Sequence, residues 1–140
     1  MTITGGCRCG KVRFTVEAEP IGARACWCRG CQYLGAGNAT INVIFPSAAL
    51  TVTGETADYS TPADSGTIMH RRFCPACGTP LFSEAETRPH LVIIRAGALD
   101  DPEIGRPGGA IWVSAAPSWA HIDPDLPAVP GQPPPPPPQD

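Results

Sequence analysis

The chain contains a decapeptide, FCPACGTPLF, that runs from Phe73 to Phe82. Its two cysteines, Cys74 and Cys77, are separated by two residues and followed directly by Gly78. A Cys-x-x-Cys turn lets two thiolates bind one metal ion, and a glycine after it relaxes the turn. This stretch therefore predicts one half of a zinc-binding site, and the fold depends on which other cysteines complete it.

The other five cysteines precede this decapeptide in two groups. One group is the pair Cys7 and Cys9, and the other is the triplet Cys26, Cys28 and Cys31. A secreted disulfide framework usually has an even number of cysteines and a signal peptide. This chain has 7 cysteines, and its first residues lack the basic and apolar segments of such a signal. Because these signals are missing, we expect a cytoplasmic location. In that compartment, close cysteine pairs indicate metal ligands and not disulfides.

Seven cysteines divide naturally into four and three. The triplet Cys26, Cys28 and Cys31 is compact enough to bind one ion unaided, which leaves Cys7, Cys9, Cys74 and Cys77 as a quartet. Structural zinc has four protein ligands, whereas catalytic zinc has three and an open position. We therefore expect two zinc ions per chain, a structural one on the quartet and a catalytic one on the triplet. A redox or incidental role of the triplet is the alternative, because short cysteine pairs also exchange thiols.

Short runs of β-branched and apolar residues predict a mainly β fold. The runs are bounded by turn-forming residues, and no window of helical length keeps an apolar stripe. The strands are predicted over residues 11–16, 41–45, 50–53, 67–73, 90–96 and 110–113. Short strands at this spacing are typical of antiparallel sheets.

The C-terminal residues are rich in proline. Ten of the 18 prolines lie from Pro117 onward, and six of them form the unbroken run Pro133 to Pro138. Such a run favours an extended polyproline II conformation without a core. We therefore predict a domain over residues 1–122 and a disordered tail over residues 123–140, either a dispensable end or a proline-rich ligand for a partner protein.

Charge and hydropathy exclude two classes of partner. The net charge is −3 and the basic residues form no cluster, so nucleic-acid binding is not expected. No apolar run reaches the roughly 18 residues that a membrane-spanning helix needs. The expected partner is a small molecule, and the sequence does not specify an oligomeric state.

Other side chains are weaker candidates for chemistry. The histidines lack metal-ligand spacing, so a structural role is expected for His70, His90 and His121. Three basic residues near the cysteines either meet an anionic substrate or are solvated charges: Arg29, Arg71 and Arg72. Residues 32–37, which follow the triplet, contain no basic residue that could bind a carboxylate. Trp112 and Trp119 are expected in the core.

Three segments resemble one known family. They are residues 5–14, residues 26–31 and the decapeptide at residues 73–82, and together they are similar to the glutathione-dependent formaldehyde-activating enzymes, a family that includes centromere protein V. The resemblance covers about residues 3–121. It implies an Mss4-like fold of antiparallel sheets stapled by zinc, and it implies the same assignment of quartet and triplet to structural and catalytic zinc.

The resemblance also implies an activity. The family's reaction is reversible carbon–sulfur bond formation between glutathione and formaldehyde, so we expect a zinc-dependent carbon–sulfur lyase acting on a small thiol–aldehyde adduct such as S-hydroxymethylglutathione. The ligands of its catalytic zinc would be Cys26, Cys28 and Cys31. Two alternatives remain at this point: a zinc-stabilised binding module without catalysis, and a thiol redox protein that uses the triplet.

Overall fold

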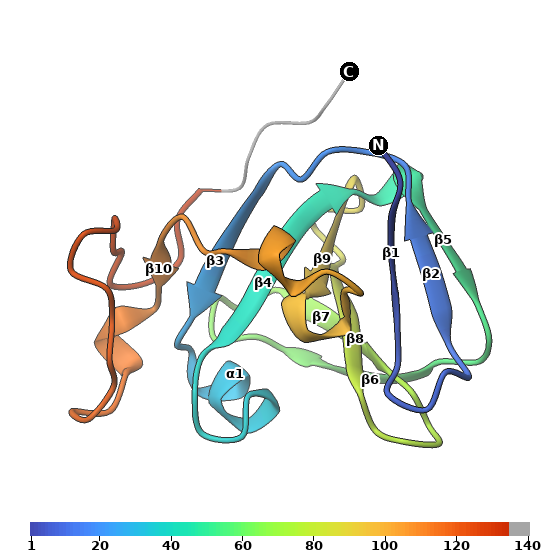
Figure 1. The fold of residues 1–140 in the computed structure, drawn as a ribbon. Helices are drawn as coiled ribbons and strands as arrows, with labels where there is room; N and C mark the ends of the chain where they lie inside the picture. Colours follow the sequence, from blue (N-terminus) through green and yellow to red (C-terminus); the bar gives the residue numbers. More distant parts are fainter. Residues whose placement is uncertain (135–140) are drawn as a thin grey trace.

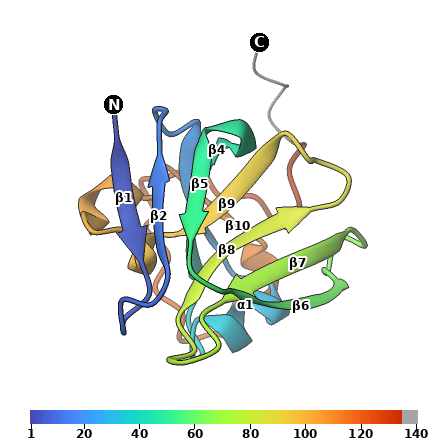
Figure 2. The ribbon, with the colours of Figure 1, turned by 90° about the vertical axis from the view of Figure 1, so that its right-hand side faces the viewer.

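A computed structural model describes residues 1–134 of the protein, and in these residues ten strands form two sheets (Figures 1 and 2). The elements are β1 (Ile3–Gly6), β2 (Arg13–Val16), β3 (Gly22–Cys26), α1 (Arg29–Leu34), β4 (Thr40–Pro46), β5 (Leu50–Thr53), β6 (Ala57–Pro62), β7 (Ile68–Phe73), β8 (Pro80–Ala85), β9 (Leu91–Arg95) and β10 (Ala110–Ile111). Short 3-10 turns lie at Ser47–Ala49, Ala96–Ala98, Pro102–Gly105 and Val113–Ala115. The predicted mainly β class is confirmed. Within residues 1–134, none of the helices combines the length and the hydropathy that crossing a bilayer requires.

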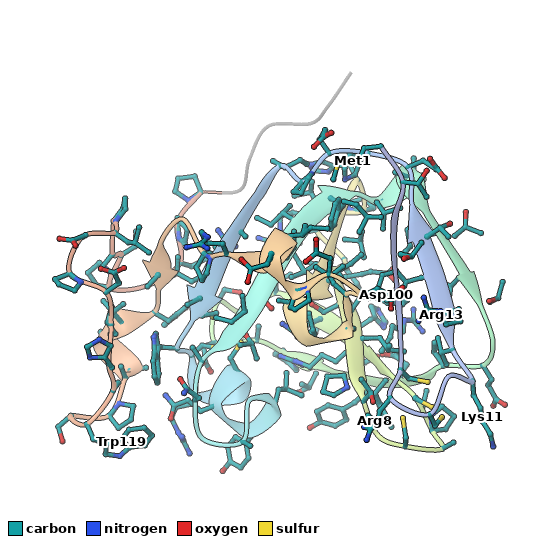
Figure 3. The ribbon with its side chains drawn as sticks, in the orientation of Figure 1. Met1, Arg8, Lys11, Arg13, Asp100 and Trp119 are labelled. Carbon is teal, nitrogen blue, oxygen red and sulfur yellow. The ribbon has the colours of Figure 1, made fainter. Side chains whose placement is uncertain are left out.

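The smaller sheet contains three antiparallel strands in the order β1-β2-β5. Its central strand β2 alternates as the sequence predicts: Phe14 and Val16 are buried, whereas Arg13 is exposed. Arg13 forms an ion pair with Asp100, which follows β9 and also accepts a hydrogen bond of 2.6 Å from Thr4 Oγ1 (Figure 3). This contact ties the outer face of the small sheet to the segment that connects β9 to β10.

The larger sheet has seven strands in the order β10-β3-β4-β9-β8-β7-β6. All of its neighbours are antiparallel except β10, which pairs in parallel with β3. The strands β3, β7 and β9 come from distant parts of the sequence, yet the sheet places them within a few strands of one another. Side chains from all three therefore reach one face of the sheet.

The two sheets share one apolar core. Phe14 and Val16 of β2 pack with Val43 and Phe45 of β4 and with Ile94 of β9, and each of the five is at most 2% exposed. Burial of each such side chain contributes about 1.5–3 kcal/mol before the entropic cost of ordering the chain. A second, smaller cluster at the other end of the sheet contains the cysteine triplet, packed with Ile111, Trp112 and Val129.

The six predicted strands are all present, with ends shifted by one or two residues. The sequence did not predict four further strands or α1. The reason is local: β3 consists of small residues around one arginine, GARAC, and most of its residues are half-buried, so no alternation marks it. Strand β8, PLFSEA, is buried on both faces at its centre, from Leu81 to Ser83, so its buried positions do not alternate.

The chain remains attached to the domain beyond the predicted boundary at residue 122, which is a correction to the predicted tail. The Val129 amide donates to the Ala110 carbonyl at 2.9 Å, and the Ala110 amide donates to the Pro127 carbonyl at 2.9 Å. Proline lacks an amide donor but keeps its carbonyl acceptor, so a proline-rich segment can still accept hydrogen bonds from the free edge of β10. The predicted disorder of residues 135–140 concerns residues outside the described part of the chain.

Candidate metal centres

The quartet joins the loop after β1 to the turn after β7. Cys7 and Cys9 lie in the first of these, Cys74 and Cys77 in the second, and their four sulfur atoms lie within 4.8 Å of one another. Figure 3 labels Arg8, which lies between Cys7 and Cys9 in the sequence, and shows sulfur atoms in yellow near it. The Arg8 amide also donates to Thr79 Oγ1 at 3.0 Å, which connects the two turns directly.

Both turns need a left-handed glycine. Gly10 follows Cys9 with a φ of +83°, and Gly78 follows Cys77 with a φ of +78°. The Gly78 amide donates to the Cys74 carbonyl at 2.8 Å, and the Val12 amide donates to Cys7 Sγ at 3.2 Å. These bonds bend the backbone around the thiols and orient their sulfur atoms inward.

The donor set of the quartet fits a tetrahedral zinc ion. A tetrahedron with zinc–sulfur bonds of about 2.3 Å has sulfur–sulfur edges of about 3.8 Å. The Cys7–Cys9 and Cys9–Cys74 sulfur separations are 3.5 and 3.8 Å. Hydrogen bonds from the Thr79 hydroxyl and then the Thr79 amide lower the pKa of Cys77 to about 5, which favours the thiolate that a metal requires.

The triplet is built by the end of β3 and the start of α1. Cys26 is the last residue of β3, Cys28 precedes α1, and Cys31 lies in its first turn. Cys28 Sγ accepts the Cys31 amide at 3.3 Å, so the thiol caps the short helix. The three sulfur atoms lie within 4.8 Å of one another, so the helix start and the strand end together form a three-sulfur site.

The three thiols of the triplet differ in acidity. Hydrogen bonds from Cys26 and then Cys28 lower the pKa of Cys31 to about 2. A hydrogen bond to Cys28, then one to Cys31, and then burial raise the pKa of Cys26. These bonds favour the thiolate form at Cys31, and a bound metal would replace the protons between the three sulfur atoms. Three thiols and an open side fit the donor set of a catalytic zinc ion.

A small cavity of about 80 Å³ lies directly beside the triplet. Its polar lining comprises Arg24, Arg71, Arg88, Arg95, Asn42, Asp64, Ser65, Ser83 and Gln132. A groove of about 340 Å³ adjoins it and shares Cys28, Asp64 and Arg71 with it. The groove is lined mainly by Tyr33, Tyr59, Leu34 and Pro62. The triplet thus lies at the junction of a charged inner cavity and a wider, more apolar groove.

A larger cavity of about 400 Å³ lies on another side of β3, and it contains no cysteine. Trp27, which separates the first two cysteines of the triplet, is 3% exposed and lines this cavity rather than the one at the thiols. The Trp27 carbonyl accepts a hydrogen bond of 2.8 Å from Gln32 Nε2. Trp27 therefore supports the loop and does not face the candidate reaction centre.

The structure separates the three arginines that the sequence singled out. Arg71 lines the triplet cavity. Arg72, on the opposite face of β7, pairs with Asp58 and Glu84 at 3.7 and 3.8 Å. Arg29 lies over the ring of Tyr33, with 5.1 Å between guanidinium carbon and ring centroid.

Sequence reasoning missed Arg24, Arg88 and Arg95, which the sheet brings from distant segments to the triplet cavity. The absence of basic residues at 32–37 therefore does not leave the triplet without cations. No local spacing signals these arginines, because they become neighbours of the cysteines only through strand pairing.

Trp119 departs from its predicted core position, whereas Trp112 is partly buried against the smaller apolar cluster. Trp119 is 68% exposed, in the loop that follows the last 3-10 turn (Figure 3). Trp112 lines the triplet cavity in a left-handed conformation with φ of +57°, which is unusual for a bulky residue. Its indole Nε1 donates to Gln132 Oε1 at 2.9 Å, so the described C-terminal segment reaches the rim of this cavity.

The histidines lie away from both thiol clusters. His121 lines the 400 Å³ cavity, and a nitrogen of His90 is buried without a hydrogen-bond partner in residues 1–134. His70 bonds Asp58 through Nδ1 at 2.8 Å and Glu86 through Nε2 at 3.2 Å on the surface of the sheet. None of the three contributes to the cysteine sites within the described chain.

The His70 cluster makes part of the stability depend on pH. Bonds to Asp58 and then Glu86 raise the pKa of His70 above its ordinary 6.5. A group with a raised pKa in the folded state contributes stability below its unfolded pKa and loses it as the pH rises through the folded pKa. The His70→Gln variant should therefore have a lower melting temperature than the parent at pH 6, and this difference should become smaller at pH 9. Thermal melts at both pH values measure it, and an equal difference in melting temperature at pH 6 and pH 9 would contradict the prediction.

Comparisons with known proteins agree with the geometry. A family model described as glutathione-dependent formaldehyde-activating enzyme matches residues 2–115. A protein of Halomonas elongata named after the same family is 31% identical over 130 residues, which cover 88% of this chain and 82% of the relative. A crystal structure of a Rhodobacter sphaeroides protein superimposes with a TM-score of 0.59 at 24% identity, over 74% of this chain and 96% of the other. That likeness shows the fold alone.

Proposed function

Because this chain belongs to the glutathione-dependent formaldehyde-activating enzyme family, we propose that it is a zinc-dependent carbon–sulfur lyase. Its substrate would be a small thiol–aldehyde adduct such as S-hydroxymethylglutathione, split and formed reversibly. The observation that carries this proposal is the cysteine triplet, whose three sulfur atoms gather beside a cavity and a groove, apart from the quartet.

We propose two metal sites with different tasks. Cys7, Cys9, Cys74 and Cys77 would hold a structural zinc, and Cys26, Cys28 and Cys31 would hold a catalytic one. When bound, a zinc ion with an open position supplies a Lewis acid that stabilises negative charge on a thiol sulfur or a hydroxymethyl oxygen. The quartet has no position to spare for substrate, because its four sulfurs complete a tetrahedron.

The residues of the cavity orient the adduct and take up its proton. As the adduct splits, its carbon–sulfur bond breaks and the electron pair stays on sulfur, while the hydroxyl proton leaves and the aldehyde C=O forms. Asp64 is the one carboxylate that lines this cavity within the described chain, and we assign it as acceptor of that proton. Its Oδ2 accepts the Arg29 amide at 3.0 Å, which positions the β6–β7 turn over α1.

The groove gives a larger thiol room beside the triplet. Its volume of about 340 Å³ is several times that of the inner cavity, and Tyr33 and Tyr59 form part of its walls. A tripeptide thiol could place its sulfur at the cavity entrance and its peptide along these rings. We also place the protein in the cytoplasm, a reducing compartment that keeps its seven free thiols reduced.

The experiment measures formaldehyde release from S-hydroxymethylglutathione by protein with two zinc ions per chain. A mild chelator should remove the three-ligand zinc first and abolish release, while circular dichroism stays unchanged, and added zinc should restore the rate. The spontaneous rate without protein is the control. One zinc per chain with no release would favour a binding module, and a disulfide among the triplet in native mass spectra would favour a redox protein.

A further inference from the structure

We propose that the cavity beside the triplet binds a carboxylate that the substrate carries close to its sulfur, and that Arg71 is the residue that holds it. The inference rests on the proposed lyase function and names its substrate class: adducts in which the thiol or the aldehyde is itself a short carboxylic acid. Arg71 acts here as a specificity-determining residue.

The cavity concentrates positive charge to an unusual degree. Arg24 of β3, Arg71 of β7, Arg88 before β9 and Arg95 of β9 all line a space of about 80 Å³. They are four of the 10 basic side chains of the whole protein. None of the four forms an ion pair within residues 1–134, although Arg13, Arg72 and Arg106 do so elsewhere.

These charges are not balanced by the residues around them. Arg24 is repelled by Arg88, and Arg95 is repelled by Arg71. Three thiolates on one zinc ion carry a net charge of about −1. Together with Asp64 they offset about half of the four positive charges. Half-buried like charges are costly without counter-charge, so the metal-loaded cavity favours an anionic occupant.

Among the four arginines, Arg71 carries the buried donor that is left unpaired in the described chain. Its Nη1 is buried and has no hydrogen-bond partner among the described residues. Arg95, by contrast, donates to Asn42 Oδ1. A planar guanidinium binds a carboxylate through two parallel hydrogen bonds, so an incoming carboxylate satisfies this donor. Arg71 also borders both the cavity and the groove, together with Cys28, which places the carboxylate next to the reacting sulfur.

The volume limits the occupant to a few atoms. A water molecule's share of liquid volume is about 30 Å³, so a cavity of about 80 Å³ holds roughly three water-sized groups. A carboxylate with its three heavy atoms fills this space, and a sulfur one carbon away then lies at its edge, next to the cysteines. A carboxylate on a long arm would lie outside the cavity, in the groove or beyond it.

Calorimetry on the zinc-loaded protein tests this with two unreactive analogues, (methylthio)acetate and the neutral 2-(methylthio)ethanol. The anion should bind at least about tenfold more tightly than the neutral compound. Arg71→Gln should remove this preference, and Arg71→Lys should restore part of it, because the charge returns without the paired donors. Arg72→Gln is the matched control on the neighbouring residue and should keep the preference. Equal affinities in the parent, or a preference that survives in Arg71→Gln, would overturn the inference.

Kinetics then identify which half of the adduct carries the carboxylate. The formaldehyde adduct of mercaptoacetate and the glyoxylate adduct of 2-mercaptoethanol are compared with the uncharged formaldehyde adduct of 2-mercaptoethanol. At least one charged adduct should show a higher kcat/KM, and Arg71→Gln should lower it toward that of the uncharged adduct. Equal kcat/KM for all three would refute the carboxylate site and leave the lyase function standing. Selective binding of (methylthio)acetate without cleavage of any adduct would support the carboxylate site and refute the lyase function.

Discussion

The Cys77→Ser variant should lose one zinc ion per chain and most of its thermal stability. A structural zinc site contributes about 10–16 kcal/mol in small zinc domains. The whole stability of a typical domain is only about 5–15 kcal/mol. Cys77 itself is exposed, and serine has nearly the same shape, so lost packing cannot explain a large effect. A large fall in stability would therefore report the loss of the metal that joins the two turns.

Circular dichroism melts and zinc content measure this effect, and Ala76→Ser is the matched control. Ala76 lies in the same turn, is also exposed, and receives the same side chain without loss of a thiol. Exposed substitutions of this kind usually change stability by less than about 0.5 kcal/mol. A Cys77→Ser variant that melts with the control and keeps two zinc ions would show that the quartet does not hold the fold together.

The Cys28→Ser variant should keep the fold and lose the activity. Cys28 caps α1 through its sulfur, and serine is among the best residues at a helix N-cap, so the helix should persist. The triplet would retain two thiols, too few to hold a catalytic zinc. Loss of a Lewis acid worth several kcal/mol lowers kcat by about a thousandfold or more.

Three measurements on the Cys28→Ser variant separate a catalytic from a structural role. Zinc content should fall from two ions per chain to one, formaldehyde release should fall to the spontaneous rate, and the melting temperature should stay near that of the parent. If Cys28→Ser and Cys77→Ser unfold alike, the assignment of different roles to the triplet and the quartet is wrong. Retained activity with one zinc would place the chemistry elsewhere.

The cysteine groups could be predicted from the sequence because metal ligands are arranged locally. Cys74 and Cys77 form one turn, and Cys28 and Cys31 flank one helix start, so each group is already close along the chain. The structure brings together the same four and the same three sulfur atoms that the spacing suggested. That these atoms bind zinc, and with which role, stays a prediction until the metal content is measured.

The strands show where local patterns stop being informative. The alternation of polar and apolar residues predicted β2, because one face of this strand is buried and the other is solvated. Such alternation could not predict β3 or β6, which are half-buried or exposed along most of their length. The return of the C-terminal segment to β10 was also hidden, because proline content signals the missing donors and not the carbonyls that accept hydrogen bonds.

The sequence by itself determined the family, the mainly β class and the grouping of the cysteines, because each depends on residues close together in the chain. Only the tertiary structure decided what surrounds the triplet. Arg24, Arg71 and Arg95 lie on three strands that become neighbours through sheet pairing, and no spacing between them encodes that proximity. The local sequence therefore groups the cysteines, and the pairing of the strands decides which charged side chains lie beside them.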